Sequence, residues 1–284
     1  MAQAICICGA GTMGSGIAQV AAQSGFDTIL YDVRTQAIEE VKLKIEKDLQ
    51  SLVTKSKITA LEKQIILSRL QFTSDITHCK ADVIIEAIVE KLEAKHDLFM
   101  QLSKINTHQS IFATNTSSLS VTDIAKKISK PERVIGMHFF NPAQVMKLVE
   151  VVNTDYTSAH ATRIILELTE QFGKVPVICK DAPGFIVNHV ARPYYLEALH
   201  LVELGISDFK TIDLLMETSG FKMGPFRLMD LIGNDVNYAV SSVVYEALRR
   251  PERLKPSPLQ QERVDKNELG RKTGKGYYSY SAKS

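Results

Sequence analysis

Residues 3–16 read Gln-Ala-Ile-Cys-Ile-Cys-Gly-Ala-Gly-Thr-Met-Gly-Ser-Gly. An apolar run ends here in closely spaced glycines, helix-forming residues follow over 17–23, and a second apolar run, Thr28–Tyr31, ends at Asp32. The order strand, glycine turn, helix, strand, acid is the context in which the pattern Gly-x-Gly-x-x-Gly binds a dinucleotide. We therefore predict that the chain begins with an α/β domain of the Rossmann type.

The three glycines of this pattern are expected to serve different purposes. Gly9 permits a tight turn, Gly11 lets the backbone approach a pyrophosphate, and Gly14 lets the helix pack close to the first strand. The N–H groups of the first helical turn, beginning at Thr12 and Met13, would then face the phosphates.

Asp32 ends the second predicted strand and is the acidic residue that the pattern requires. Its carboxylate would accept hydrogen bonds from both ribose hydroxyls, and its charge would repel a 2′-phosphate. Asp32 therefore favours NAD over NADP, although Arg34 lies two residues away and weakens that preference.

The rest of the chain predicts two domains. Further strands are expected at 82–87, 111–115, 134–137, 148–152 and 175–178, and helices at 35–69 (its second piece at 59–70), 91–104, 121–129 and 158–172. Composition changes at Asp181–Phe185, and beyond it only helical patterns occur, at 185–204, 209–219 and 229–248, before a proline-rich tail (251–258) and a glycine loop (271–276). We predict a Rossmann-type N-terminal domain over 1–182, carrying a helical-hairpin insertion, and an all-helical C-terminal domain over 183–284.

Composition narrows the classes of function. The 284 residues are 45% hydrophobic and 23% charged, with a net charge of +2, which argues against nucleic acid or an anionic membrane as a main partner. No apolar run approaches the ~20 residues that span a bilayer. The first strand begins almost at Met1, which leaves no room for a signal peptide. We expect the four cysteines to be reduced thiols without a metal. Reduced thiols place the protein in the cytoplasm, or in an organelle matrix if a transit peptide has been removed.

A polar cluster lies in two apolar strand patterns. His138-Phe139-Phe140-Asn141-Pro142 follows one of them, and Glu150 lies within the other. Buried polar groups must pair with one another or with a ligand. A histidine held by a carboxylate is the usual form of a general base near neutral pH. The alternative is a core histidine that a backbone carbonyl satisfies.

Other polar residues fall where strands end, which is the edge at which open α/β sheets bind ligands. Ser117 follows the strand at 111–115, but a serine there also serves as a helix cap. Glu90 and Lys95 begin the helix after the strand at 82–87, and the alternative for them is an exposed pair without a role. The basic link Lys55–Lys57 has the same alternative, ordinary solvated lysines.

Several motifs together resemble the short-chain L-3-hydroxyacyl-CoA dehydrogenase family, including the 3-hydroxybutyryl-CoA dehydrogenases. The resemblance covers essentially the whole chain. Its carriers, in order, are residues 9–16 (GAGTMGSG), 86–90 (EAIVE), 115–119 (NTSSL), 134–143 (VIGMHFFNPA), 147–151 (KLVEV), 181–188 (DAPGFIVN), 223–226 (MGPF) and 270–278 (GRKTGKGYY).

The resemblance implies a role for each matching residue. His138 would take the proton of the substrate's 3-hydroxyl as hydride leaves C3 for NAD, and Glu150 would hold the imidazole and stabilise its protonated form. Ser117 and Asn188 would bind the reacting oxygen or the thioester, and Asn141 would face the nicotinamide.

The resemblance also implies cofactor, substrate and partner contacts. Glu90, Lys95 and Ser117 would lie near the nicotinamide ribose, Ala87 would line the cofactor, and Lys275 would contact it. Lys55 and Lys57 would lie near the CoA phosphates of an acyl-CoA substrate. The helical domain would close the substrate cleft and form a homodimer.

Three alternatives remain. Arg227 and Asn234 resemble the 3-hydroxyadipyl-CoA branch of the phenylacetate pathway about as well as the butyryl branch, and Arg227 would pair with a distal carboxylate or be exposed. A non-catalytic, crystallin-like NAD-binding protein is the second alternative. The third, a dehydrogenase of the 2-hydroxyacid type, would need a lysine near Asn188. Gln144 departs from the commonest family pattern, which has proline there.

Overall fold

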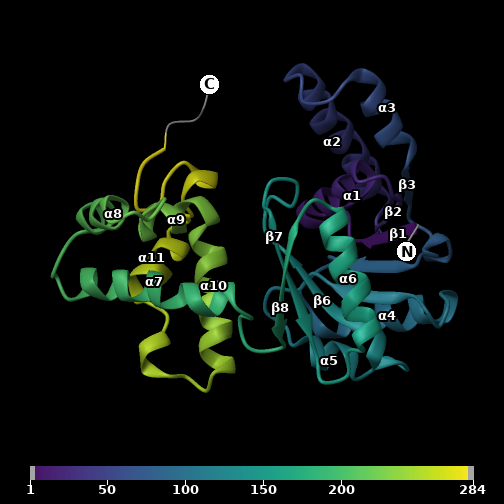
Figure 1. Cartoon of the computed structure of the whole chain (residues 1–284). Helices are drawn as coiled ribbons and strands as arrows, with labels where there is room; N and C mark the ends of the chain where they lie inside the picture. The colour runs from purple at the N-terminus through teal and green to yellow at the C-terminus, as the bar shows by residue number, and fades with distance from the viewer. Residues whose placement is uncertain (1–3, 281–284) are drawn as a thin grey trace. The chain divides into compact units, whose positions relative to one another are not determined.

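The computed structural model describes residues 4–280, which divide into two compact units, one up to Ala182 and the other from Pro183 on (Figure 1). The first unit contains an eight-stranded sheet of order β3-β2-β1-β4-β5-β6-β7-β8. The strands are β1 (Ala4–Cys8), β2 (Asp27–Tyr31), β3 (Leu70–Thr73), β4 (Val83–Glu86), β5 (Ile111–Thr114), β6 (Val134–Phe139), β7 (Leu148–Asn153) and β8 (Val175–Lys180). All neighbouring strands are parallel except β6 and β7. This sheet confirms the Rossmann-type prediction.

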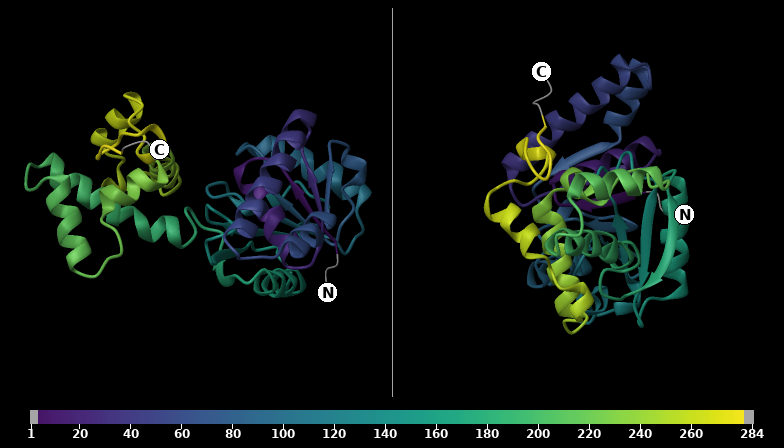
Figure 2. Two further views of the ribbon diagram at one scale, coloured as in Figure 1. Left: turned by 90° about the horizontal axis from the view of Figure 1, so that it is seen from above. Right: turned by 90° about the vertical axis from the view of Figure 1, so that its left-hand side faces the viewer.

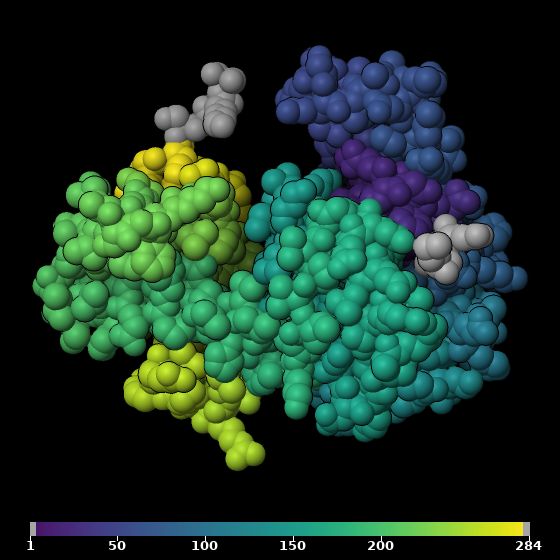
Figure 3. All heavy atoms as spheres, in the orientation of Figure 1, coloured from purple at the N-terminus to yellow at the C-terminus, as the bar shows by residue number. Residues whose placement is uncertain are grey.

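Helices connect the parallel strands. They are α1 (Thr12–Gln23), α2 (Thr35–Thr54), α3 (Ala60–Ser68), α4 (Leu92–Ile105), α5 (Val121–Ala125) and α6 (Ala159–Gln171), with short 3₁₀ turns at Ile76–His78 and Pro131–Arg133. In α2 the buried residues Ile38, Val41, Ile45 and Leu49 recur every three or four positions, so one face packs on the core. The far end of α2 and α3 form a hairpin, drawn in blue, that stands out from the rest of this unit (Figures 1 and 3).

The sequence prediction of the hairpin was wrong at its end. Leu70, predicted as the last helical residue, begins β3, a strand over residues 70–73 that the sequence analysis did not predict. It pairs with β2 in parallel register, with Leu30 opposite Phe72. Only Leu70 of this four-residue strand is buried, so it carries little apolar pattern of its own. The pairing with β2, which lies far away in the sequence, determines the strand.

The second unit is helical over residues 183–280, as predicted, and both views in Figure 2 show it as helices and loops only. Its elements are α7 (Val187–Glu203), α8 (Phe209–Thr218), α9 (Pro225–Ile232), α10 (Asn234–Ala247) and α11 (Pro258–Asp265), with 3₁₀ turns at Glu252–Leu254 and Arg271–Thr273. The single helix predicted at 229–248 is two helices, because Gly233 between them has φ +107°. Helix α11 was not predicted.

Two buried aspartates hold this unit together. Asp213 on α8 accepts hydrogen bonds from the N–H of Phe226 and Arg227 and from the Tyr278 hydroxyl. Asp230 on α9 accepts from the backbone N–H of Tyr277 and Tyr278, which fastens the C-terminal glycine loop to the helices. Within residues 4–280, no helix combines the length and the apolar character that crossing a bilayer requires.

Candidate functional site

The glycine turn has the geometry that its three glycines were predicted to provide. Gly9 has φ +110°, and a Cβ there would lie 2.5 Å from the Ala87 carbonyl oxygen. A Cβ on Gly14 would lie 1.8 Å from the Gly9 oxygen, so only glycine allows α1 to begin this close to β1. A Cβ on Gly11 would meet no described heavy atom within 4 Å. The space in front of Gly11 is therefore open to a ligand.

Helix α1 begins directly after Gly11, with Thr12 and Met13 in its first turn. That turn contains no acidic residue, so no negative side chain of the turn neutralises the positive end of the helix dipole. An anion such as a pyrophosphate suits this position because the first backbone N–H groups of a helix have no partner within the helix.

Asp32 lies directly after β2 and is held in place by backbone donors. Its carboxylate accepts hydrogen bonds from the N–H of Ala10 at 2.9 Å and of Arg34 at 3.0 Å, and Arg34 Nε approaches it at 3.3 Å. Burial opposes the charge, but these donors outweigh it and hold the pKa of Asp32 below its ordinary value. Asp32 is therefore a fixed carboxylate beside the glycine turn.

His138 and Glu150 lie directly opposite each other on the antiparallel strands β6 and β7. Nδ1 of His138 is 2.8 Å from Oε2 of Glu150, and only 5% and 1% of the two residues' surfaces are exposed. Since a carboxylate accepts, the proton of this bond is assigned to Nδ1. The partner of Nδ1 is therefore a carboxylate. An imidazole held in this way exchanges protons through Nε2.

Strand β6 is longer than predicted and includes His138 itself. Asn115, at the end of β5, accepts a hydrogen bond from the Phe139 N–H at 2.8 Å, which fixes the strand just after the histidine. The Phe140 ring lies 4.6 Å from the His138 ring, and the exposed Asn141 follows, with a cis peptide bond to Pro142.

The link from β6 to β7 is held by a lysine that the sequence did not single out. Nζ of the buried Lys174 donates to the carbonyl oxygens of Ala143 at 2.6 Å and of Met146 at 2.8 Å. Gln144 in the same link donates to Gln19 of α1 at 3.3 Å. The segment between the histidine and glutamate strands is thus attached to the helix that begins at the glycine turn.

Glu90 and Lys95 are not the exposed pair that the alternative describes. Only 1% of the Lys95 surface is exposed, and its Nζ lies 2.6 Å from Glu86 and 3.1 Å from Glu90. Glu90 accepts from the Ser117 N–H at 3.2 Å, so Ser117 lies beside this pair. Burial raises the pKa of Glu90, but the Lys95 charge and nearby hydroxyl donors more than compensate and lower it.

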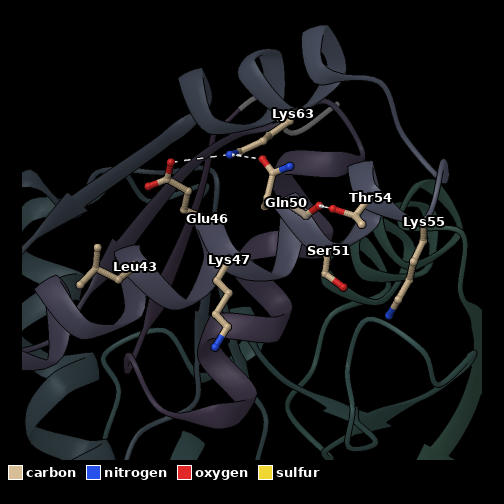
Figure 4. A pocket seen from close by; sticks show the side chains of 8 residues that line it. All are labelled: Leu43, Glu46, Lys47, Gln50, Ser51, Thr54, Lys55 and Lys63. Atoms are coloured by element: carbon tan, nitrogen blue, oxygen red, sulfur yellow. Dashed lines mark hydrogen bonds and ion pairs between the residues drawn. The ribbon is translucent and has the colours of Figure 1, made fainter.

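An open hollow of about 670 Å³ lies along α2, beside Lys63 of α3 (Figure 4). Lys47, Lys55 and Lys63 line it, whereas Lys57 is exposed beyond its lining. Nζ of Lys63 lies 3.6 Å from the Glu46 carboxylate. In Figure 4 the ammonium groups of Lys47 and Lys55 point away from Lys63, to the other side of α2.

The second unit contains the remaining predicted residues. Asn188 is half-buried in the first turn of α7. Lys275 forms an ion pair with Glu268 at 2.5 Å. Arg227 pairs with Glu217 at 2.6 Å and lies over the Tyr278 ring, so its charge already has a partner.

The fold and the glycine turn define a dinucleotide-binding protein, and its sheet also contains a buried histidine–glutamate pair. Comparison with known proteins agrees with this class. Residues 4–182 match the model of the 3-hydroxyacyl-CoA dehydrogenase NAD binding domain, and residues 184–280 match that of the 3-hydroxyacyl-CoA dehydrogenase C-terminal domain. The chain belongs to the 3-hydroxyacyl-CoA dehydrogenase family.

Individual relatives differ in length and in named substrate. The chain is 47% identical to the 3-hydroxyadipyl-CoA dehydrogenase of Escherichia coli, over 99% of this chain but 59% of that protein. It is 41% identical to a probable 3-hydroxybutyryl-CoA dehydrogenase of Deinococcus radiodurans, over 96% of this chain and 99% of that protein. The structure of (S)-3-hydroxybutyryl-CoA dehydrogenase from Ralstonia eutropha superposes with a TM-score of 0.94 at 36% identity, over 99% of this chain and 100% of that one.

Proposed function

We propose that this protein is an NAD-dependent L-3-hydroxyacyl-CoA dehydrogenase that interconverts 3-hydroxyacyl-CoA and 3-ketoacyl-CoA. The observation that carries the proposal is the buried 2.8 Å contact between His138 and Glu150 in a chain of this family. Oxidation of a secondary alcohol removes a hydride from carbon and a proton from oxygen. The pair supplies the base for the proton.

In the oxidation direction, Nε2 of His138 accepts the proton of the 3-hydroxyl while hydride leaves C3. The ring then carries a positive charge, and Glu150 stabilises it through Nδ1. In the reduction direction the protonated ring returns the proton to the 3-keto oxygen. Ser117 and Asn188 donate to the reacting oxygen or the thioester, and Asn141 faces the nicotinamide.

The residues around the glycine turn suit NAD. The open space at Gly11 and the first turn of α1 take the pyrophosphate, and Asp32 binds the ribose hydroxyls. Glu90 and Lys95 lie beside Ser117, and these residues would lie near the nicotinamide ribose. When bound, NAD accepts the hydride and NADH returns it. The Ala87 carbonyl lies beside Gly9 and would line this space. Lys275 is paired with Glu268 in the helical unit, and its role as a cofactor contact is proposed on the family resemblance alone.

The acyl-CoA substrate brings phosphates and a long pantetheine arm. Lys55 and Lys57 at the tip of the hairpin would hold the phosphates, and Lys47 presents its charge on the same side as Lys55. We further propose that the protein is a cytoplasmic homodimer joined through the helical unit, where Leu214 and Leu215 of α8 are 66% and 62% exposed.

A spectrophotometric assay tests the proposal. Purified protein is mixed with NADH and acetoacetyl-CoA, and NADH absorbance is followed, with NADPH in a parallel reaction. The proposal predicts rapid oxidation of NADH and slower oxidation of NADPH. Bound NADH without turnover of any 3-ketoacyl-CoA would instead favour the non-catalytic, crystallin-like alternative.

A second candidate, 3-hydroxyadipyl-CoA dehydrogenase, is favoured by the E. coli relative at 47% identity. The ion pair of Arg227 with Glu217 speaks against Arg227 as a receptor for the distal carboxylate. Values of kcat/KM for four-carbon, ten-carbon and adipyl 3-ketoacyl-CoAs separate the candidates. If the Arg227→Ala variant loses activity only with the adipyl substrate, this residue does bind the carboxylate.

A further inference from the structure

Glu86 is a fully buried carboxylate at the end of β4, and neither the glycine turn nor the histidine–glutamate pair uses it. A buried charge is costly unless donors surround it. Here Oε1 accepts from the Ile88 N–H at 2.7 Å and from Lys95 Nζ at 2.6 Å, and Oε2 accepts from the Thr114 hydroxyl at 2.7 Å. Protein donors therefore occupy both oxygens, and no ligand can reach them.

Lys95 connects the buried Glu86 to Glu90, which lies nearer the surface. Its ammonium group is buried between two carboxylates, Glu86 at 2.6 Å and Glu90 at 3.1 Å. Glu86 belongs to strand β4 and holds the ammonium group from the buried side. The sheet therefore sets the position of Lys95 and of the Glu90 oxygen that is bonded to it. Glu90 is the outermost of the three, with 37% of its side chain exposed.

Glu90 in turn organises the loop that carries Ser117. Its Oε1 accepts from the Thr116 hydroxyl at 2.5 Å, from the Ser118 hydroxyl at 3.0 Å and from the Ser117 N–H at 3.2 Å. The Thr116 hydroxyl also accepts from the Leu119 N–H at 2.9 Å, which closes the turn. One carboxylate therefore contacts every residue from 116 to 118, including the serine proposed to bind substrate.

We propose that Glu86 is a positioning residue of the reaction, acting through Lys95 and Glu90 on the loop that holds Ser117. Glu86 touches neither substrate nor cofactor. Its charge holds Lys95 between two anions, so that Glu90 is not drawn inward and keeps its oxygen on the Ser117 N–H. The inference rests on the proposed dehydrogenase function, because Ser117 acts on the substrate and cofactor of that reaction.

The variant Glu86→Gln tests this, because it removes the charge and keeps the shape. We expect kcat/KM for acetoacetyl-CoA to fall by about tenfold or more, as loss of a hydrogen bond to a charged group does. Glu93→Gln is the matched control, since Glu93 is an exposed glutamate on the same helix as Lys95 and should keep wild-type activity. Equal kcat/KM for Glu86→Gln and wild type would overturn the proposal.

A double-mutant cycle with Ser117→Ala separates positioning from a general loss of stability. If Glu86 acts through Ser117, the double variant retains the kcat/KM of Ser117→Ala to within about twofold. Multiplication of the two single losses would show that Glu86 acts elsewhere, and would overturn the proposal. Should Glu86→Gln not fold, Thr114→Val removes only one donor to Glu86 and is tested in the same cycle, with an expected loss of about threefold.

Failure of the proposed function looks different from failure of this inference. Wild-type protein without turnover refutes the function, whereas an active wild type with a multiplicative cycle refutes only the role of Glu86. The same cycle is also measured on the dissociation constant of NADH, by the fluorescence of bound NADH. There too, weaker binding that is not additive with Ser117→Ala supports the role of Glu86, and additive losses contradict it.

Discussion

Replacing Glu150 with glutamine perturbs the proposed base while leaving its surroundings in place. The carboxylate is buried and accepts from His138 Nδ1 at 2.8 Å. The amide has the same size but no charge to stabilise the imidazolium that forms during oxidation. If the glutamine turns its NH₂ group toward Nδ1, it also selects the wrong tautomer, with the proton on Nε2, where the base must accept.

The expected magnitude follows from these contacts. A hydrogen bond to a charged group contributes about 1.5–3 kcal/mol, which corresponds to about tenfold to 150-fold in rate. The tautomer effect adds to this, so we expect kcat to fall by about 100-fold or more. The dissociation constant of NADH should not change, because Glu150 lies on β7, away from the glycine turn at the end of β1.

The assay is the initial rate of acetoacetyl-CoA reduction, with NADH binding and the melting temperature measured on the same samples. Glu132→Gln is the control, because Glu132 is exposed just before β6 and undergoes the same chemical change. A kcat for Glu150→Gln within about twofold of the wild-type value, in folded protein, would refute the reasoning.

Other substitutions give equally specific outcomes. Gly11→Ala should fold normally but bind NADH about tenfold or more weakly, because its Cβ enters only the open space. Gly14→Ala should have a clearly lower melting temperature than the wild type, because its Cβ would lie 1.8 Å from the Gly9 oxygen. Asp32→Asn should lower the ratio of kcat/KM with NADH to kcat/KM with NADPH, because the charge that repels a 2′-phosphate is lost. The pKa of Asp32 is lowered, so the stability that its carboxylate contributes is present above the ordinary aspartate pKa and is lost only as pH falls through the lowered value. The carboxylate therefore stays charged at mildly acidic pH, and NADH affinity should stay constant there. Lys174→Met should cost about 2–4 kcal/mol in urea unfolding, since two carbonyl oxygens lose their donor.

The sequence predicted the parts of the fold that local patterns encode. The glycine turn, the acid after the second strand and the change to helical patterns near residue 183 each depend on neighbouring residues. Strand β3 could not be predicted in this way, because its four residues follow a helix directly and are held by pairing with β2. The break at Gly233 could have been predicted, since a glycine before asparagine in a helical pattern is a common helix end.

The candidate site was predicted less completely. The sequence singled out Glu90 and Lys95 but not Glu86, which reads as an ordinary end of an apolar strand. Only the structure shows that a lysine nine positions later reaches back to it and is buried there. Lys174 was missed for the same reason, because its two carbonyl partners lie about thirty residues earlier in the chain.

The central claim is that His138 is the base and acid of a 3-hydroxyacyl-CoA dehydrogenase. The most direct measurement compares wild-type protein and His138→Ala for NADH oxidation with acetoacetyl-CoA, and for NADH binding by fluorescence. We predict rapid turnover by the wild type and a loss of about 1,000-fold or more in the variant, at unchanged NADH affinity. Turnover by the variant near the wild-type rate would contradict the account.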